Sequence, residues 1–232
     1  MKKIVIISNE ETAQDPGYVR HPEQYGLAEG ICNIPNLAGV IEGLGGYEVS
    51  VLHHTRVRQV EESGADCVVL SGRFSDKALP YEDMLEEFRE EIHWLRETRM
   101  PVLGICMGLQ LLCAAHGVGI KRLEREEGEF GFMPIRLRDG WPMPEGSGEY
   151  IRCLAMHRCQ VERVPEEFVG LAGSELCDVQ MIAHKSRPMV GVQFHPEFYT
   201  AAYPDGKILL WQLLARLTDG GNRKGFSPWQ KA

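Results

Sequence analysis

The sequence lacks long apolar runs, clusters of basic residues and closely spaced cysteine pairs. No window approaches the roughly 18 consecutive apolar residues of a transmembrane helix, so we expect no membrane span. The net charge is −8 and no run of Lys or Arg occurs, which argues against nucleic acid or an anionic membrane as the main partner. The seven cysteines contain no C-x-x-C, and a chain of 232 residues needs no disulfides to fold, so we expect a reducing cytoplasm.

Nucleotide-binding motifs are also absent. The sequence has no G-x-x-x-x-G-K-[ST], no G-x-G-x-x-G and no S-G-G-x-D-S pyrophosphatase loop. We therefore expect no cofactor. The composition, with 44% hydrophobic and 25% charged residues, is that of an ordinary globular protein that can bury a full core.

Short apolar runs alternate with helical patterns in the first half of the sequence. We expect buried strands at Lys3–Ser8, Tyr47–Leu52, Cys67–Leu70 and Pro101–Ile105. The helical spacing of apolar residues predicts helices over Asn36–Leu44, Tyr81–Thr98 and Met107–His116. Alternation of strand and helix is typical of a parallel sheet. The polar segment Ser8–Gly30 is long for such a connection, and its pattern predicts no role for it.

The second half of the sequence predicts shorter strands and a closing helix. We expect strands at Phe130–Arg138 and within Ile151–Val164, a hairpin of Met181–Ala183 with Met189–Phe194, and a helix over Ile208–Leu217. The whole pattern predicts an α/β fold of three layers. Its central sheet is mainly parallel, helices cover both faces, and a small antiparallel extension comes from the second half. We expect one domain over residues 1–217, followed by a tail at residues 218–232.

Cys106 lies in P-V-L-G-I-C-M-G-L-Q-L-L, where an apolar strand runs into a helical pattern. A sharp turn from strand to helix crowds the backbone and favours small residues two positions before and after it, which Gly104 and Gly108 supply. The turn leaves the thiol at the N-terminal end of the helix, whose unpaired amides favour thiolate over thiol. We therefore expect Cys106 to be a nucleophile. The alternative is a buried core cysteine, an interpretation that fits Cys67 and Cys113 inside their apolar patterns.

A thiol nucleophile needs a base and a group that orients the base. His195 ends a short apolar run in G-V-Q-F-H-P-E, and Glu197 follows two residues later. Residues two apart in an extended segment point to the same side, and Pro196 stiffens the link between them. Glu197 could thus hold the imidazole in one tautomer while its other nitrogen faces Cys106. Taken alone, the tripeptide is more often a surface loop.

Together the two motifs resemble the class I (triad) glutamine amidotransferases. The glutaminase domain of that family uses a G-x-C-x-G-x-Q elbow and a later H-P-E, which stand here as G-I-C-M-G-L-Q and G-V-Q-F-H-P-E. The resemblance covers about Lys3 to Leu217. Within it, E-F-G-F-M-P-I and A-M-H-R-C-Q-V-E are similar to the glutaminase half of GMP synthase, whereas the segment around Cys106 is also close to the glutaminase subunit of imidazole glycerol phosphate synthase.

The resemblance implies hydrolysis of the side-chain amide of L-glutamine to glutamate and ammonia. Cys106 would attack the amide carbon, His195 would transfer protons, and Glu197 would orient His195. The oxyanion would need preorganised backbone donors. One would be the amide of Met107, and the other would come from the loop at Gly72 and Arg73.

Arg73 departs from the family pattern, because many members have glycine at this position. We expect the substitution to make a flip of the Gly72–Arg73 peptide harder and to leave a cationic side chain near the site. For substrate binding, the same resemblance implies contacts of glutamine with Gln110, and of its α-amino and carboxylate groups with Gly131 and Phe132. A solvent-facing position on the helix is the alternative interpretation for Gln110.

The fate of the ammonia implies a partner. Ammonia is protonated at neutral pH, so amidotransferases pass it through a channel to a synthase site, for which this chain is too short. We therefore expect a separate synthase subunit that docks around the Cys106 cleft. Two alternatives stay open: a γ-glutamyl hydrolase that acts on γ-glutamyl-amines without a partner, and a catalytically silent regulatory relative.

Other histidines and cysteines give weaker signals. His157 matches a histidine of the family that is not the base, and a structural role is at least as consistent with the sequence. Cys153, His157 and Cys159 could be imagined as metal ligands, but the spacing C-x-x-x-H-x-C fits no common zinc site, so we expect no metal.

Overall fold

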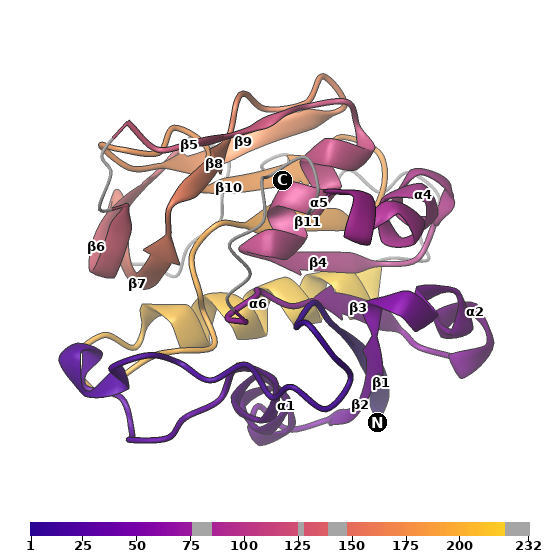
Figure 1. Ribbon diagram of the computed structural model, residues 1–232, viewed down its shortest axis with the longest axis horizontal. Helices are drawn as coiled ribbons and strands as arrows, with labels where there is room; N and C mark the ends of the chain where they lie inside the picture. The colour runs from indigo at the N-terminus through magenta and orange to yellow at the C-terminus, as the bar shows by residue number, and fades with distance from the viewer. Residues whose placement is uncertain (76–84, 125–127, 139–147, 221–232) are drawn as a thin grey trace.

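One large sheet organises the chain, whose computed structural model describes residues 1–75, 85–124, 128–138 and 148–220. The sheet has nine strands in the order β2-β1-β3-β4-β11-β10-β9-β6-β7 (Figure 1). Its first five strands run parallel and are β2 (Tyr47–His53), β1 (Lys2–Ser8), β3 (Cys67–Leu70), β4 (Val102–Ile105) and β11 (Met189–Val192). The carboxyl ends of parallel strands meet at one edge, so residues that follow β1, β3, β4 and β11 gather there.

The remaining four strands continue the same sheet in antiparallel pairing. They are β10 (Met181–His184), β9 (Phe168–Gly173), β6 (Glu129–Leu137) and β7 (Tyr150–His157). A separate two-stranded antiparallel sheet consists of β5 (Ile120–Arg122) and β8 (Cys159–Val161). The β10–β11 hairpin joins the parallel and antiparallel parts without a break in the hydrogen-bonded order.

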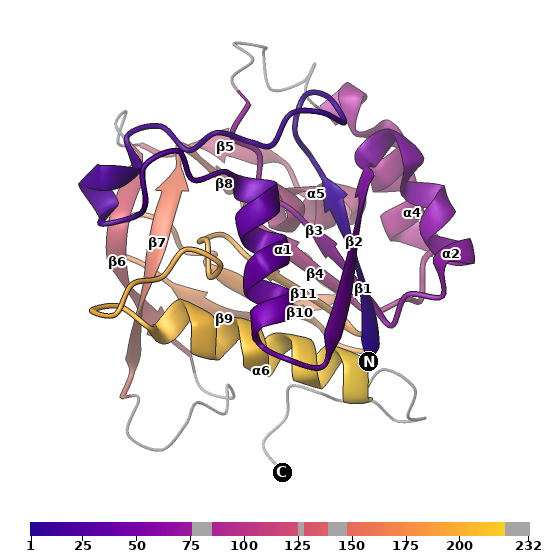
Figure 2. The same cartoon turned by 90° about the horizontal axis from the view of Figure 1, so that it is seen from below.

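Helices cover both faces of the parallel strands. On one face lie α1 (Asn33–Gly43) and α6 (Asp205–Gly220), which cross in front of the sheet in Figure 2. On the other face lie α2 (Val60–Ser63), α4 (Arg89–Glu97) and α5 (Met107–Ala115), with the short 3₁₀ helix η2 (His54–Gln59) beside them.

Strand β1 shows how the two cores form. Ile4 and Ile6 join the cluster that includes α1 and α6, whereas Val5 and Ile7 join the cluster that includes α4 and α5. Successive side chains of a strand point to opposite faces, so a continuous apolar run is what a strand covered on both sides requires.

The structure confirms the predicted α/β class and most of the predicted elements. The strand at Cys67–Leu70 has the predicted bounds. Helix α1 begins three residues earlier than predicted, at Asn33. The first residues of the helix predicted over Tyr81–Thr98 lie outside the described residues. So does most of the predicted tail, because α6 continues to Gly220 and residues 221–232 are not described.

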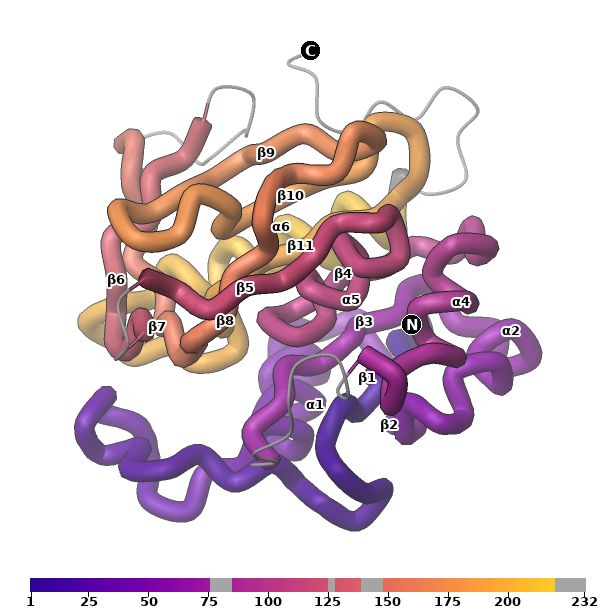
Figure 3. The backbone as a smooth tube through the Cα atoms, turned by 45° about the horizontal axis from the view of Figure 1, so that its top comes forward, coloured from indigo at the N-terminus to yellow at the C-terminus, as the bar shows by residue number. Residues whose placement is uncertain are grey.

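The connection between β1 and α1 is a long segment with one 3₁₀ helix, η1 (Pro22–Tyr25). Figure 3 shows it as an indigo tube that extends along one side of the molecule before it returns to α1. Over the described ranges, we find no helix with the length and apolar character needed to cross a membrane.

Arg187 fixes the end of α4. It is buried, and its guanidinium Nη1 donates to the carbonyl oxygens of Leu95, Arg96 and Thr98 at 3.2–3.4 Å. The last carbonyls of a helix lack partners within the helix, and a cation there also offsets the negative end of the helix dipole. The Nδ1 atom of His184 accepts the backbone N–H of Arg187 at 2.9 Å. Burial, followed by the charge of Arg187, lowers the pKa of His184 to about 4.

We expect His184 to make the protein less stable at acid pH. Its pKa in the folded chain, about 4, lies below the unfolded value of about 6.5. Its contribution to stability is therefore complete above about pH 6.5 and is lost as the pH falls toward 4. The urea concentration at half-unfolding should fall between pH 7 and pH 5 in both proteins. The fall should be smaller for His184→Asn than for the wild type. An equal loss in both proteins would contradict the assignment, and His93→Asn, on an exposed part of α4, is the control.

Candidate active site

Cys106 sits at a strained turn between β4 and α5. Its backbone has φ 51° and ψ −101°, a region that residues other than glycine rarely adopt. Its N–H donates to the carbonyl of Val192 at 2.7 Å, and its own carbonyl accepts the first helical hydrogen bond, from Gln110, at 3.2 Å. The cysteine is therefore the N-cap of α5, and its thiol lies at the carboxyl edge of the parallel strands.

Two glycines make this turn sterically possible. A Cβ atom on Gly104 would lie 2.6 Å from the backbone of Gly108, and one on Gly108 would lie 2.6 Å from the carbonyl oxygen of Leu70. Both contacts involve backbone, which cannot move aside as a side chain can. The spacing of glycines around Cys106 is thus required by the approach of α5 to β3 and β4.

His195 and Glu197 meet Cys106 at this edge. The Nδ1 atom of His195 lies 2.7 Å from Oε1 of Glu197, and both side chains are almost completely buried. The imidazole and the Cys106 side chain lie against the same residue. Gly72 is their common neighbour, because a Cβ atom there would lie 2.5 Å from Cε1 of His195 and 3.4 Å from Cβ of Cys106. The structure thus brings together the three residues predicted to form the triad.

The charge balance at His195 favours an imidazolium. Burial lowers its pKa, but the carboxylate of Glu197 and the Cys106 side chain outweigh burial and raise the pKa of His195 to about 10. An imidazolium at this position would hold, beside the sulfur of Cys106, the proton that a leaving amine needs.

Backbone and side chains of several elements surround Cys106 in a cleft of about 710 Å³. This volume is within the range of small-molecule sites. Arg73 and Met107, two of the predicted oxyanion residues, line the cleft together with Cys106. Gly72, the third, lies beside His195 and Cys106. The oxyanion role of these amides stays a prediction. The outer wall comes from the β1–α1 segment, through Tyr18, Arg20, His21, Gln24 and Tyr25.

The side chain of Arg73, which we expected to leave a cationic group near the site, is paired with a carboxylate. Its Nη1 atom lies 3.2 Å from Oε1 of Glu87, and the side chain is only 4% exposed. The guanidinium also lies over the ring of Phe88, 5.5 Å from its centre. The positive charge is therefore neutralised beside α4. The sequence gives no signal for this ion pair, because Arg73 and Glu87 lie in different segments of the chain.

Gln110 is buried and lines the cleft, which excludes a solvent-facing position. Its Nε2 donates to Oε1 of Gln193 at 3.2 Å, and Nε2 of Gln193 lies 3.5 Å from Sγ of Cys106. Gln193 was not predicted from the sequence. The sequence feature that could have identified Gln193 is its place in G-V-Q-F-H-P-E, two residues before His195. Contact of Gln110 with glutamine stays a prediction.

Strand β6 passes the cleft with Phe130 as its lining residue. The next residue, Gly131, has φ 117°, a conformation that favours glycine. The ring of Phe132 stacks on Tyr203 with ring centres 4.5 Å apart. The predicted substrate contacts of Gly131 and Phe132 stay predictions.

His157 belongs to a second buried polar cluster. Its Nε2 lies 2.9 Å from Oε2 of Glu129, and its Nδ1 lies 3.0 Å from the carbonyl of Cys159. Glu129, His157 and Cys177 offer atoms close enough to hold a metal ion. However, the Glu129 carboxylate also accepts 2.6 Å hydrogen bonds from Ser174 and Gln180. These interactions tie the carboxylate into a buried polar network, consistent with the structural role considered for His157.

Comparison with known proteins gives first the fold and then the family. The structure superposes on a crystal structure of a glutamine amidotransferase from Thermotoga maritima with a TM-score of 0.67, at 18% identity, over 94% of this chain and 99% of that one. At this identity the likeness shows the fold. Residues 34–209 match the family described as "Glutamine amidotransferase class-I". The chain therefore belongs to the class I glutamine amidotransferase family.

Two curated proteins with the same name are similar to this chain in sequence. The chain is 32% identical over 152 residues to a glutamine-hydrolyzing GMP synthase subunit of Methanopyrus kandleri, a match that covers 65% of this chain and 76% of the relative. It is 31% identical over 115 residues to the protein of the same name from Methanothermobacter thermautotrophicus, covering 50% and 61%. The family match begins at residue 34, so the β1–α1 segment that walls the cleft lies outside it.

We expect Gly108→Ala to destabilise the fold, because its Cβ would press on the Leu70 backbone. Overpacking of this kind typically costs about 1–3 kcal/mol. Gly39→Ala, at an exposed position of α1 with nothing within 4 Å of the new Cβ, is the matched control. It should be neutral or stabilising by up to about 1 kcal/mol. Urea unfolding of both variants checks the difference, and equal free energies of unfolding would show that the close approach is absent.

We expect Glu197→Gln to lower the pKa of His195, because the variant removes the carboxylate that raises it. A titration of ¹³Cε1-labelled histidine by NMR measures this pKa directly, with His195→Asn to assign the resonance. Glu61→Gln, at an exposed position of α2, should leave the titration unchanged. A His195 pKa that is the same in Glu197→Gln as in the wild type would rule out the proposed electrostatic coupling.

Proposed function

We propose that the chain is a glutaminase that hydrolyses the side-chain amide of L-glutamine and supplies ammonia to a separate synthase. The proposal depends chiefly on one observation. The imidazole of His195 is held 2.7 Å from Glu197, and it lies against Gly72 together with the side chain of Cys106, a cysteine at a strained helix N-terminus. Membership of the class I glutamine amidotransferase family supports glutamine as the substrate.

The reaction follows from the atoms in the site. The Cys106 thiolate attacks the amide carbon, and the developing oxyanion accepts hydrogen bonds from the amides of Met107 and Arg73. The carbon–nitrogen bond then breaks, and the proton of the His195 imidazolium leaves with the nitrogen as ammonia, giving a glutamyl thioester. His195, now neutral, takes a proton from water, which attacks the thioester and releases glutamate and the thiolate.

Glu197 contributes through His195. The carboxylate accepts a hydrogen bond from Nδ1 of His195 and so fixes the ring with Nε2 facing the sulfur. It also stabilises the imidazolium that acts as the acid. Gln193 and Gln110 form a chain of amides beside the sulfur. We assign Gln110 to substrate contact, with Gly131 and Phe132 as candidates near the α-amino and carboxylate end.

A partner protein would receive the ammonia. The relatives are named as one subunit of a glutamine-hydrolyzing GMP synthase, which supports a role in nucleotide biosynthesis and a second subunit for the acceptor chemistry. This chain carries none of the nucleotide-binding motifs that such chemistry requires. We therefore propose that the synthase subunit docks around the Cys106 cleft. We also propose that the protein acts in the cytoplasm.

A second candidate function is hydrolysis of γ-glutamyl-amines. The observation in its favour is the outer wall of the cleft, because Tyr18 and Tyr25 come from a segment outside the family match and could contact an amine substituent. Rates of product release from L-glutamine and from a series of γ-glutamyl-amines separate the two functions. A preference for the substituted amides would favour the second.

We expect Cys106→Ala to abolish ammonia release from L-glutamine, a loss of at least about 10³-fold, because it deletes the nucleophile. His195→Asn should be nearly as damaging, and Glu197→Gln less so, since an imidazole is still present. Ammonia is measured enzymatically for the chain alone and with extract of the source organism, with a mixture that lacks the chain as the blank. Circular dichroism confirms that each variant folds. Activity retained in Cys106→Ala would refute the proposed function.

A further inference from the structure

A second carboxylate lies beside the triad, and neither the motifs nor the reaction above uses it. Glu10 is completely buried and follows β1 by two residues. Because β1 and β3 are parallel neighbours, the residues after Ser8 and those after Leu70 meet at the same edge. Glu10 therefore faces the loop that carries two of the predicted oxyanion residues.

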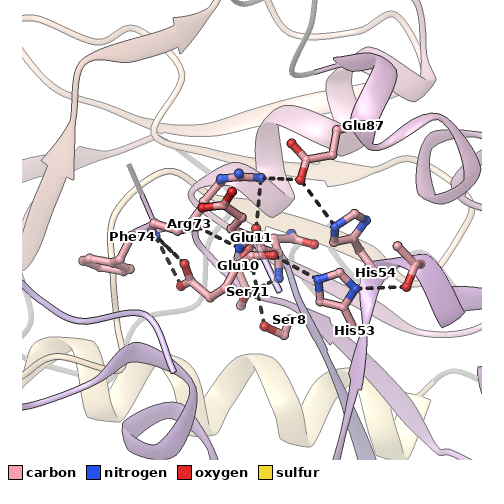
Figure 4. Close-up of polar contacts among 12 residues, drawn as sticks. Ser8, Glu10, Glu11, His53, His54, Ser71, Arg73, Phe74 and Glu87 are labelled. Carbon is pink, nitrogen blue, oxygen red and sulfur yellow. Dashed lines mark hydrogen bonds and ion pairs between the residues drawn. The ribbon is translucent and has the colours of Figure 1, made fainter. Parts of the chain in front are cut away.

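The carboxylate of Glu10 binds backbone amides of that loop. The N–H of Phe74 donates to both oxygens at 3.0 and 3.2 Å, and the N–H of Ser75 donates to Oε2 at 2.8 Å (Figure 4). The side-chain amide of Asn33 donates to Oε1 at 3.0 Å. These four contacts compensate the burial of the carboxylate.

Asn33 extends this arrangement to the Gly72–Arg73 peptide. The Nδ2 atom that contacts Glu10 also donates to the carbonyl of Gly72 at 3.2 Å, and the hydroxyl of Ser71 donates to the same oxygen at 2.7 Å. In a planar trans peptide the N–H points away from the carbonyl. With the Gly72 carbonyl held by Asn33 and Ser71, the Arg73 N–H is directed to the opposite side.

The same loop adjoins the reacting groups. Arg73, Phe74 and Cys106 line the same cleft, and Gly72 touches the imidazole. The ring of Phe74 packs on His195 with ring centres 4.9 Å apart. The loop anchored by Glu10 therefore contacts the base and, through the Arg73 amide, reaches the cleft.

We propose that Glu10 is a positioning residue for this hydrolysis. It holds the loop of residues 72–75 in the orientation that directs the Arg73 amide toward the oxyanion. The inference rests on the proposed function, since an oxyanion forms only if the site performs acyl transfer. Glu10 does not touch the substrate and acts through Phe74, Ser75 and Asn33.

The rate at which iodoacetamide alkylates Cys106 distinguishes a positioning role of Glu10 from general damage to the site. Attack of Cys106 on an amide creates an oxyanion, whereas its reaction with iodoacetamide displaces iodide at a saturated carbon and creates none. Loss of loop positioning should therefore slow glutamine hydrolysis and leave alkylation intact. A distorted nucleophile or a misfolded chain would slow both.

The first test is Glu10→Gln. This variant keeps the shape of the side chain but places a neutral amide opposite the backbone N–H groups of Phe74 and Ser75. We expect kcat for glutamine to fall about 10- to 100-fold, the range expected for a misplaced oxyanion donor, with KM changing less than about threefold. The rate of Cys106 alkylation, followed by mass spectrometry, should stay within about twofold of the wild type.

Gly17 gives an independent test from the opposite side of Glu10. A Cβ atom on Gly17 would lie 2.2 Å from Oε1 of Glu10, so Gly17→Ala should push the carboxylate away from the loop. Gly17 has φ 71°, and the alanine therefore also strains the backbone. Gly30→Ala is the matched control, because Gly30 has φ 73° and nothing within 4 Å of the new Cβ. We expect only Gly17→Ala to reproduce the fall in kcat.

Three outcomes would overturn the inference. An unchanged kcat in Glu10→Gln would show that the anchor does not matter for the reaction. A parallel fall in kcat and alkylation would assign Glu10 a merely structural role, as would equal effects of Gly17→Ala and Gly30→Ala. A wild type without glutaminase activity, alone or with extract, would instead overturn the proposed function, and this inference would fall with it.

Discussion

The approach of α5 to the ends of β3 and β4 is the constraint on which the rest of the site depends. The helix backbone comes so close that only hydrogen fits at Gly104 and Gly108, and the chain turns at Cys106 with a positive φ that is rare for residues other than glycine. Cores on both faces of the sheet hold these elements together. The packing of the whole domain therefore supports the strain at one residue, whose sulfur is held at the positive end of a helix.

Much of the fold follows from local sequence signals. Strands covered on both faces must be continuously apolar, which made β1, β3 and β4 recognisable, and the bounds of β3 were predicted without error. The glycines around Cys106 predicted the elbow because steric crowding at a turn acts within a few residues. The contact of His195 with Glu197 was predictable for the same reason, since both residues lie in one short segment.

Features that depend on neighbouring strands could not be predicted in this way. Glu10 and Ser75 are far apart in the sequence, and only the β1–β3 pairing brings them together. The pairing of Arg73 with Glu87 likewise depends on how separate segments of the chain pack together. The β1–α1 segment carries no periodic pattern, so its position along the cleft became visible only in three dimensions.

The backbone N–H of His195 donates to the carbonyl of Leu154 in β7 at 2.8 Å, whereas that of Cys106 donates to Val192 in β11. Strand β7 is the last in the sheet order and β11 is in the middle. The antiparallel half must therefore curl back until its far edge meets the end of a central strand. Because the imidazole is attached to β7 and the sulfur to β11, a movement of one strand relative to the other would change the distance between the two reacting groups.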